Sequence, residues 1–163
     1  MKATTLLKND HAAVKKLLAD FSHTTTRAAR RRQELIDKIA QELEIHSTIE
    51  EELFYPAVKN ERGGQSLMKE AESEHKKVDA LVAEAQGMSM ETEEVLQKVK
   101  ELRDAVVHHA TEEESEMFPI AETGLGEQLM ELGEQMAARK KELATSSVQK
   151  AKRLIKKAVR KAS

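Results

Sequence analysis

Hydrophobic residues along this chain recur every three or four positions, which is the spacing expected of helices that bury one face. In the first such segment they are Leu6, Leu7, Val14, Leu17, Leu18 and Phe21, and they predict a helix over residues 5–21. The same spacing predicts further helices over residues 28–55, 66–85 and 91–118, and a fifth that ends near residue 144. Pro56 and Pro119 set two of these ends, because a proline disfavours helical conformation in the residue before it.

The loops between the predicted helices are short, and short loops favour antiparallel neighbours. We therefore expect an all-α, up-and-down four-helix bundle with an additional C-terminal helix. The composition agrees, since the 163 residues include only 2 prolines, 6 glycines and 2% aromatic residues. The arginine run 30–32, at the start of the second helix, is expected on the solvated surface.

The chain contains no cysteine, which excludes disulfide bonds and thiolate metal sites. Any metal would therefore be held by His, Asp, Glu or Tyr. No apolar run reaches the length of a membrane span, and the N-terminal segment MKATTLLKND lacks the hydrophobic core of a signal peptide. These features predict a cytoplasmic protein without a transmembrane segment.

Charge divides the chain near residue 143. No acidic residue follows Glu142 but seven lysines and arginines do, so the net charge of −2 combines a body at −9 with a tail at +7. We expect a domain over residues 1–143 and a basic amphipathic tail over residues 144–163. The apolar residues of the tail share one helical face; they are Val148, Ala151, Leu154, Ile155, Ala158 and Val159. The tail is either a flexible, solubilising end or a helix that makes non-specific contacts with nucleic acid, an anionic membrane or the acidic bundle.

An internal repeat runs through the first four predicted helices. Asp10-His11 matches Glu74-His75, 64 residues later. HSTIEEELFYP, residues 46–56, matches HATEEESEMFP, residues 109–119, 63 residues later. Each half therefore supplies one early histidine and one HxxxE motif.

The geometry of a helix tells where the HxxxE groups point. His46 and Glu50 lie one turn apart on the same face. That face is the apolar one, because Leu43, Ile39 and Ile36 stand three, seven and ten residues before His46. The same offsets before His109 give Val106, Leu102 and Val99, whereas the neighbouring His108 is expected in solvent.

Four histidines and two glutamates are thus predicted to project into one small bundle. Buried carboxylates must be neutralised or coordinated, because an unpaired buried charge is very costly. Imidazole with carboxylate and without sulfur suits iron or manganese, with zinc as a common competitor. Two bridging carboxylates and histidines on facing helices, contributed equally by two half-repeats, favour a dinuclear centre.

These motifs, over about residues 3–142, resemble those of the hemerythrin-like, HHE cation-binding family of helical bundles. In that family the matching residues hold a non-haem centre of two iron ions, joined by an oxo or hydroxo bridge. The resemblance implies that the metal ligands are His11, His46, Glu50, His75, His109 and Glu113.

One departure from the family pattern concerns function. Oxygen-carrying hemerythrins have a fifth histidine in an HxxxH motif, where this chain has His75-Lys76-Lys77-Val78-Asp79. Both irons therefore keep an open position unless Tyr55 or Asp79 fills one. Tyr55 is either a packing residue or a tyrosinate ligand, and Asp79 is either a helical companion of His75 or a ligand. Two open positions favour turnover over reversible storage of O₂.

The four-histidine pattern is similar to that of bacterial hemerythrin-like proteins that act on peroxide, and to the iron-responsive hemerythrin domain of a ubiquitin-ligase subunit. We therefore expect a di-iron protein that reacts with peroxide or O₂, with catalase-like activity in oxidative stress defence. The alternatives are a non-catalytic sensor or binder of iron, O₂ or nitric oxide, and a helical interaction protein that acts through its basic tail. Four acidic residues beside the ligands either face solvent or support a ligand histidine; they are Asp10, Glu51, Glu74 and Glu114.

Overall fold

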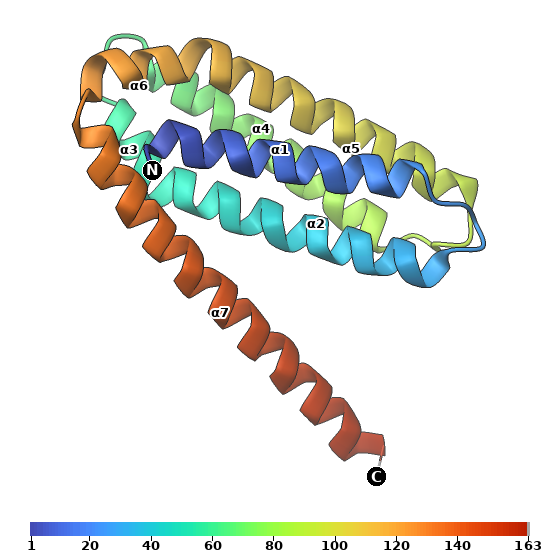
Figure 1. The fold of residues 1–163 in the computed structure, drawn as a ribbon. Helices are drawn as coiled ribbons and strands as arrows, with labels where there is room; N and C mark the ends of the chain where they lie inside the picture. Colours follow the sequence, from blue (N-terminus) through green and yellow to red (C-terminus); the bar gives the residue numbers. More distant parts are fainter. Residues whose placement is uncertain (163) are drawn as a thin grey trace.

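The computed structural model describes residues 1–162, except the side chains of residues 151–153, 158 and 162. Four long helices form an up-and-down bundle, as the hydrophobic spacing predicts (Figure 1). They are α1 (Ala3–Ser22), α2 (Ala29–Ile49), α4 (Gly64–Gln86) and α5 (Glu93–Glu112). Short loops join α1 to α2 and α4 to α5, and each helix also contacts a neighbour from the other half.

The predicted helix ends at Pro56 and Pro119 are wrong. Each long helix instead passes through one π-helical turn, η1 (Glu50–Phe54) or η2 (Glu113–Met117), and continues as α3 (Tyr55–Val58) or α6 (Phe118–Leu125). At the end of η1 the Tyr55 N–H donates to the Glu50 carbonyl, five residues back. This wider turn restarts the helix just before the proline, which then occupies a first-turn position where its missing N–H costs little.

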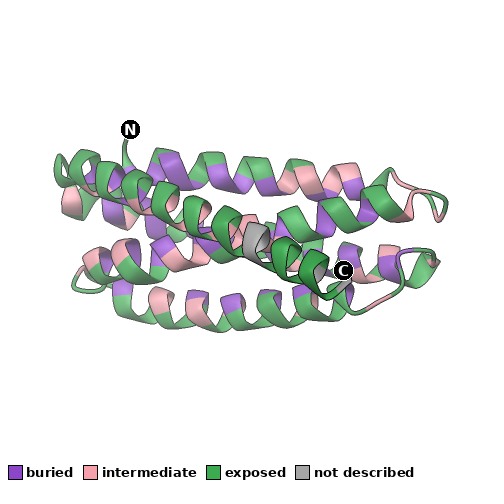
Figure 2. Ribbon diagram, turned by 90° about the horizontal axis from the view of Figure 1, so that it is seen from below, coloured by how far each residue is buried: buried purple, intermediate pink, exposed green. Residues whose placement is uncertain are grey.

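The buried residues recur along each helix of the bundle (Figure 2). Their apolar members form two clusters. One fills the end that contains the α1–α2 and α4–α5 loops, and includes Leu18, Ile39 and Leu102. The other lies at the opposite end under α3, α6 and α7, and includes Leu7 and Phe54. The buried polar residues of the two HxxxE motifs belong to neither cluster, so a polar layer interrupts the core.

α7 (Gln128–Ala162) is a single helix, so the predicted end near residue 144 is wrong. Its first turns pack on α1, α2 and η1, and bury Leu129 and Met136 completely. At Gly133 the backbone of residues 1–3 passes so close that a Cβ atom would lie 2.0 Å from the Met1 carbonyl oxygen. Further along, the helix leaves the bundle (Figure 1).

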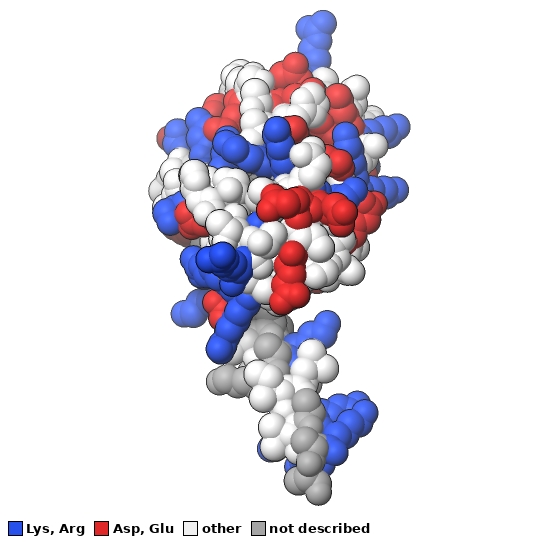
Figure 3. All heavy atoms as spheres, turned by 90° about the vertical axis from the view of Figure 1, so that its right-hand side faces the viewer, with Lys and Arg blue, Asp and Glu red and all other residues white. Residues whose placement is uncertain are grey.

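The C-terminal part of α7 carries the basic residues of the tail (Figure 3). The side chains of Leu154 and Ile155 are 62% and 65% exposed. Ala151 and Ala158 of the predicted apolar face, and Lys152 and Arg153 of the basic tail, lie outside the described side chains. No helix within the described residues is long and apolar enough to cross a membrane.

Arg32 is fully buried, so the expected solvation of the arginine run holds only for Arg30 and Arg31. Its guanidinium donates to the carbonyl oxygens of Met90 and Thr92 at 3.0 and 2.9 Å, and to Thr24. The side chain thereby ties the loop between α1 and α2 to the loop between α4 and α5. Arginine suits this role because its planar fork carries five donors.

Candidate metal centre

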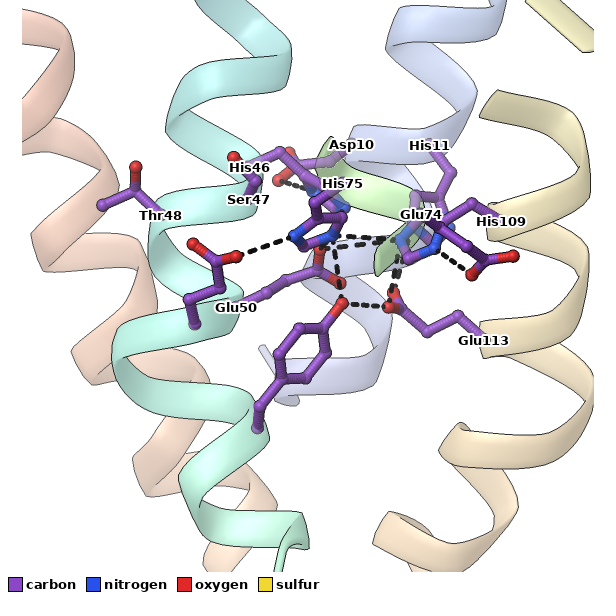
Figure 4. A network of polar contacts seen from close by, with 12 residues as sticks. Asp10, His11, His46, Ser47, Thr48, Glu50, Glu74, His75, His109 and Glu113 are labelled. Atoms are coloured by element: carbon purple, nitrogen blue, oxygen red, sulfur yellow. Dashed lines mark hydrogen bonds and ion pairs between the residues drawn. The ribbon is translucent and has the colours of Figure 1, made fainter. Parts of the chain in front are cut away.

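The six predicted ligands meet in the polar layer of the bundle (Figure 4). Each of the four long helices contributes one histidine, and each π turn begins with one of the glutamates. All six residues are at most 6% exposed; they are His11, His46, Glu50, His75, His109 and Glu113. π turns are frequent at functional sites, and here both turns start at the carboxylates.

The six side chains form two overlapping groups of potential metal donors. The first consists of His11, His46, Glu50 and Glu113, and the second of Glu50, His75 and His109. Within each group the donor atoms lie within 4.8 Å of one another. Glu50 belongs to both groups, because its Oε1 lies 3.1 Å from the Nε2 atoms of both His46 and His75.

Glu113 also spans the two groups. Its Oε1 lies 3.3 Å from the Nε2 of His11, and its Oε2 lies 3.3 Å from the Nε2 of His109. Each glutamate therefore faces histidines from both half-repeats. This is the arrangement that two bridging carboxylates require in a dinuclear site.

Unsatisfied buried atoms indicate that this set of side chains fits a cation. Four buried side-chain atoms that could bind a metal lack a hydrogen-bond partner among the described residues: His11 Nε2, His46 Nε2, Glu50 Oε2 and Glu113 Oε1. Each buried unsatisfied polar atom costs about 1–3 kcal/mol. A divalent cation bound between imidazole nitrogens and carboxylate oxygens would satisfy them, and the absence of sulfur suits iron, manganese or zinc.

Every histidine of the centre is held from behind by a carboxylate. His11 Nδ1–H donates to Glu114 at 3.0 Å, and His46 Nδ1–H donates to Asp10 at 3.1 Å. The second half repeats both contacts: His75 donates to Glu51 at 3.2 Å, and His109 to Glu74 at 2.9 Å. Such contacts orient each ring with its Nε2 toward the centre, as in most metal-binding histidines. Of the two roles open to these acidic residues, the geometry supports the histidine-supporting one.

Lys140 is a part of the site that the sequence analysis missed. It extends from α7 and donates to Asp10 Oδ1, while Asp10 Oδ2 accepts from His46. A hydrogen bond between residues 130 positions apart leaves no periodic signal in a sequence. α7 is therefore connected to the centre through Lys140 and Asp10.

The charges of the centre depend on one another. Burial alone would lower the pKa of His46, but the Glu50 carboxylate and the hydrogen bond to Asp10 raise it to about 10. Burial would likewise lower the pKa of His109, but the hydrogen bond to Glu113 and the nearby Glu50 raise it to about 11. His46 and His109 of the metal-free chain thus hold protons that neutralise the buried glutamates. A metal ion must displace these protons.

Tyr55 lies within the centre. Its side chain is fully buried, its hydroxyl donates to Glu113 Oε2 at 2.8 Å, and the same oxygen lies 3.1 Å from His75 Nε2. Burial, with the charges of Glu50 and Glu113, raises the pKa of Tyr55 well above its ordinary value. In the metal-free chain Tyr55 is therefore a phenol that donates a hydrogen bond. Phe118, its repeat counterpart, stacks on His11 with a ring-centroid distance of 6.1 Å.

Asp79 lies outside both donor groups. It is exposed, and its carboxylate is one of the groups that line a small cavity beside the four histidines. This cavity has a volume of about 30 Å³ and also contacts Val14, Val78 and Val106. That volume holds a molecule of about the size of water.

His108 is 63% exposed, as the sequence predicts. It points away from the centre, toward Glu74 and Glu112.

Together, the fold and this site define a helical bundle with a buried, histidine- and carboxylate-lined candidate metal centre. Residues 2–121 match the hemerythrin HHE cation-binding domain, and the chain belongs to this family. The structure is similar to the crystal structure of a hemerythrin HHE cation-binding domain-containing protein from Mycobacterium kansasii. The TM-score is 0.82 and the sequences are 28% identical, with 93% of each chain covered.

A curated relative comes from Nostoc sp. strain PCC 7120 and is named DNA nickase. It is 25% identical over 131 residues, which cover 80% of this chain and 36% of the relative. The chain thus corresponds to about a third of the length of that protein.

Proposed function

We propose that this protein binds two iron ions between its half-repeats and reacts with hydrogen peroxide in a catalase-like manner. The observation that carries the proposal is the pair of buried glutamates shared by four histidines, with unsatisfied donor atoms facing one another. Iron in this site would supply a redox couple and open coordination positions. The proposed ligands are His11, His46, Glu50, His75, His109 and Glu113.

The surroundings of the centre favour turnover of a very small molecule over storage of O₂. The donor groups contain four histidines and not five, and Asp79 belongs to neither group. The adjacent cavity is lined by apolar side chains, the ligand histidines, Ser47 and two aspartates, and its volume of about 30 Å³ admits only a molecule of a few atoms. Hydrogen peroxide and O₂ meet this limit.

Residues of the chain itself have distinct roles in this proposal. The carboxylates behind the histidines hold each Nε2 toward the centre. Tyr55, a buried phenol, donates a hydrogen bond to Glu113 and so holds one of the proposed ligands in place. The small volume of the cavity limits the access of larger reductants.

The test is O₂ evolution from hydrogen peroxide by purified protein of measured iron content. We expect the rate to rise in proportion to bound iron, and to fall to the level of the metal-free chain in His46→Ala and His109→Ala. His23→Ala is the matched control, since His23 is an exposed histidine outside the donor groups. Iron-loaded protein without peroxide turnover would contradict the catalase-like assignment.

A second candidate is a non-catalytic sensor of iron, O₂ or nitric oxide. It is favoured by the unsatisfied donor atoms, because loss of metal would leave the polar layer of the core incompletely paired. A sensor would show a large metal-dependent change in protease resistance with little peroxide turnover. An enzyme would show turnover whatever the size of that change.

The C-terminal part of α7 is proposed to make non-specific contacts with phosphate-bearing surfaces, of which we favour DNA. Its lysines and arginines follow an acidic body, and it contains no aromatic residue for base stacking. The name of the cyanobacterial relative is a further reason to test DNA. We expect salt-sensitive binding to random duplex DNA that is lost when residues 145–163 are deleted. Binding to anionic vesicles but not to DNA would point to a membrane surface instead.

A helical interaction protein that needs no metal is the remaining alternative. It would keep its fold in chelator and lose its partner with the same deletion.

A further inference from the structure

A third group of potential metal donors lies on the outer surface of α4 and α5, next to the buried centre. It consists of Glu74, His108 and Glu112. His108 Nε2 lies 3.2 Å from Glu74 Oε2 and 3.2 Å from Glu112 Oε1. His108 and Glu112 are one turn apart, so the segment HHATEE contains two HxxxE motifs shifted by one residue. One motif points inward and the other outward.

Glu74 connects the outer group with the buried centre. Its Oε1 accepts from Nδ1–H of His109, while its Oε2 faces His108. The side chain of Glu74 is 18% exposed, and that of His108 is 63% exposed. An ion in solvent can therefore reach the outer group without passing through the core.

The first half-repeat, residues 3–58, has no equivalent of this outer group, so the outer group is not part of the repeated pattern. The positions equivalent to His108 and Glu112 are Ile45 and Ile49, and both are buried. The repeat alone therefore does not account for the outer donors.

The equivalent carboxylate in the first half does have a cation on its outer oxygen. Asp10 is the counterpart of Glu74: its Oδ2 accepts from His46, and its Oδ1 accepts from the ammonium group of Lys140. In the second half, the outer oxygen of Glu74 faces an imidazole and a second carboxylate. The position that Lys140 occupies beside Asp10 is thus lined by metal-binding groups beside Glu74.

The neighbouring surface adds negative charge. A groove beside Glu74 and His108 is also lined by Glu101, Asp104 and Lys77. Lys98 pairs with Glu101 at 3.3 Å, so Glu74 and Asp104 supply most of the unbalanced negative charge. Acidic groups around a surface hollow raise the local concentration of cations.

We propose that Glu74, His108 and Glu112 form an outer binding site for a divalent transition-metal ion. One imidazole and two carboxylates suit Mn²⁺, Fe²⁺ or Zn²⁺, and they leave coordination positions for water. This site does not depend on which metal the buried centre holds or on what that centre does.

The experiment is a titration with Mn²⁺, with free ion measured by electron paramagnetic resonance, on protein whose buried centre has already been loaded. We expect one further Mn²⁺ per chain. His108→Ala and Glu112→Gln should weaken its binding at least tenfold, and the absorption spectrum of the buried centre should not change. His23→Ala, the matched control, should bind like the unaltered chain. Because His108 is largely exposed, its replacement does not threaten the fold.

Two results would overturn the proposal: no saturable Mn²⁺ beyond the buried centre, or unchanged binding in His108→Ala. If the buried centre takes up no iron, the same titration of the metal-free chain still decides the matter. His108→Ala would then lower the total number of bound Mn²⁺ ions by one. The outcome for the outer site is thus separate from the outcome for the proposed enzyme.

Discussion

The two halves of the bundle, residues 3–58 and 64–121, build their share of the centre in the same way and differ in what surrounds it. Each half supplies an early histidine, an HxxxE motif, a π turn that starts at the glutamate, and carboxylates behind the histidines. The surroundings differ because Tyr55 stands where the second half has Phe118, and Ile45 stands where it has His108.

This difference separates two kinds of residue. The repeated residues determine how many donor atoms meet and how they are held, so they set the capacity for metal. The unrepeated residues make one side of the centre polar and the other apolar: Tyr55 donates to Glu113, whereas Phe118 stacks on His11 and packs edge-to-face on Phe54. We infer that the chemistry of the centre depends on the unrepeated residues.

The largest effect is expected when either shared glutamate is removed. Glu50→Ala, in the first half, and Glu113→Ala, in the second, should each lower metal content from two ions per chain to less than one. The reason is that each carboxylate faces histidines of both halves. Metal analysis of the purified variants, with circular dichroism as the check on folding, measures this. Retention of one tightly bound ion in either variant would show that the halves bind metal independently.

A smaller effect is expected for the carboxylates behind the histidines. Glu51→Gln and Glu114→Gln occupy equivalent places and support His75 and His11. Each should weaken metal binding by about 10- to 100-fold, which is the usual cost of losing such a partner. Competition with a chelator of known affinity gives the two values. A large difference between the two variants would show that the halves are not equivalent even in their repeated residues.

The metal-free chain should become less stable as pH rises. One histidine from each half has a raised pKa, about 10 for His46 and about 11 for His109, against an ordinary value of 6.5. The folded chain therefore holds protons that the unfolded chain has released, so this stability is complete below pH 6.5 and is lost as pH rises through about 10 to 11. Carboxylates with lowered pKa, such as Glu50, act only at lower pH.

Thermal unfolding in the presence of a chelator measures this effect. We expect the Tm to fall by at least about 4 °C between pH 6 and pH 9, which corresponds to roughly 1–2 kcal/mol for a chain of this size. The metal-loaded protein should not show this fall, because the ions replace the protons. A metal-free chain that is equally stable or more stable at pH 9 would contradict the assigned protonation.

Tyr55→Phe makes the two halves alike and should affect metal content least. The variant loses the 2.8 Å hydrogen bond to Glu113 but none of the six proposed ligands. We expect two ions per chain and a peroxide turnover about 10- to 100-fold below that of the unaltered protein, which is the usual range for loss of a partner that holds a metal ligand. Loss of an ion, or of a visible absorption band, would instead identify Tyr55 as a ligand.

Much of the centre follows from the sequence because its residues obey a local period. Leu43 and Ile39 before His46, and their counterparts before His109, identify the inward face of each helix. The doubled motif then brings the two faces together. Both inferences need only the helical repeat and burial of apolar side chains.

The errors concern contacts and backbone geometry that have no local period. Pro56 disfavours an α-helix before it, but the wider hydrogen bond from Tyr55 to Glu50 removes the conflict. Arg32 is buried because carbonyl oxygens from a loop about 60 residues away satisfy it. The continuity of α7 did have a signal: neither glycine nor proline occurs after Gly133.

The most direct test of the account is the iron content per chain of protein purified aerobically from iron-supplemented cells, together with its absorption spectrum. We predict two irons per chain and near-ultraviolet absorption from a bridged iron pair. A correctly folded helical protein that binds no metal, even when iron is supplied, would contradict the proposed centre.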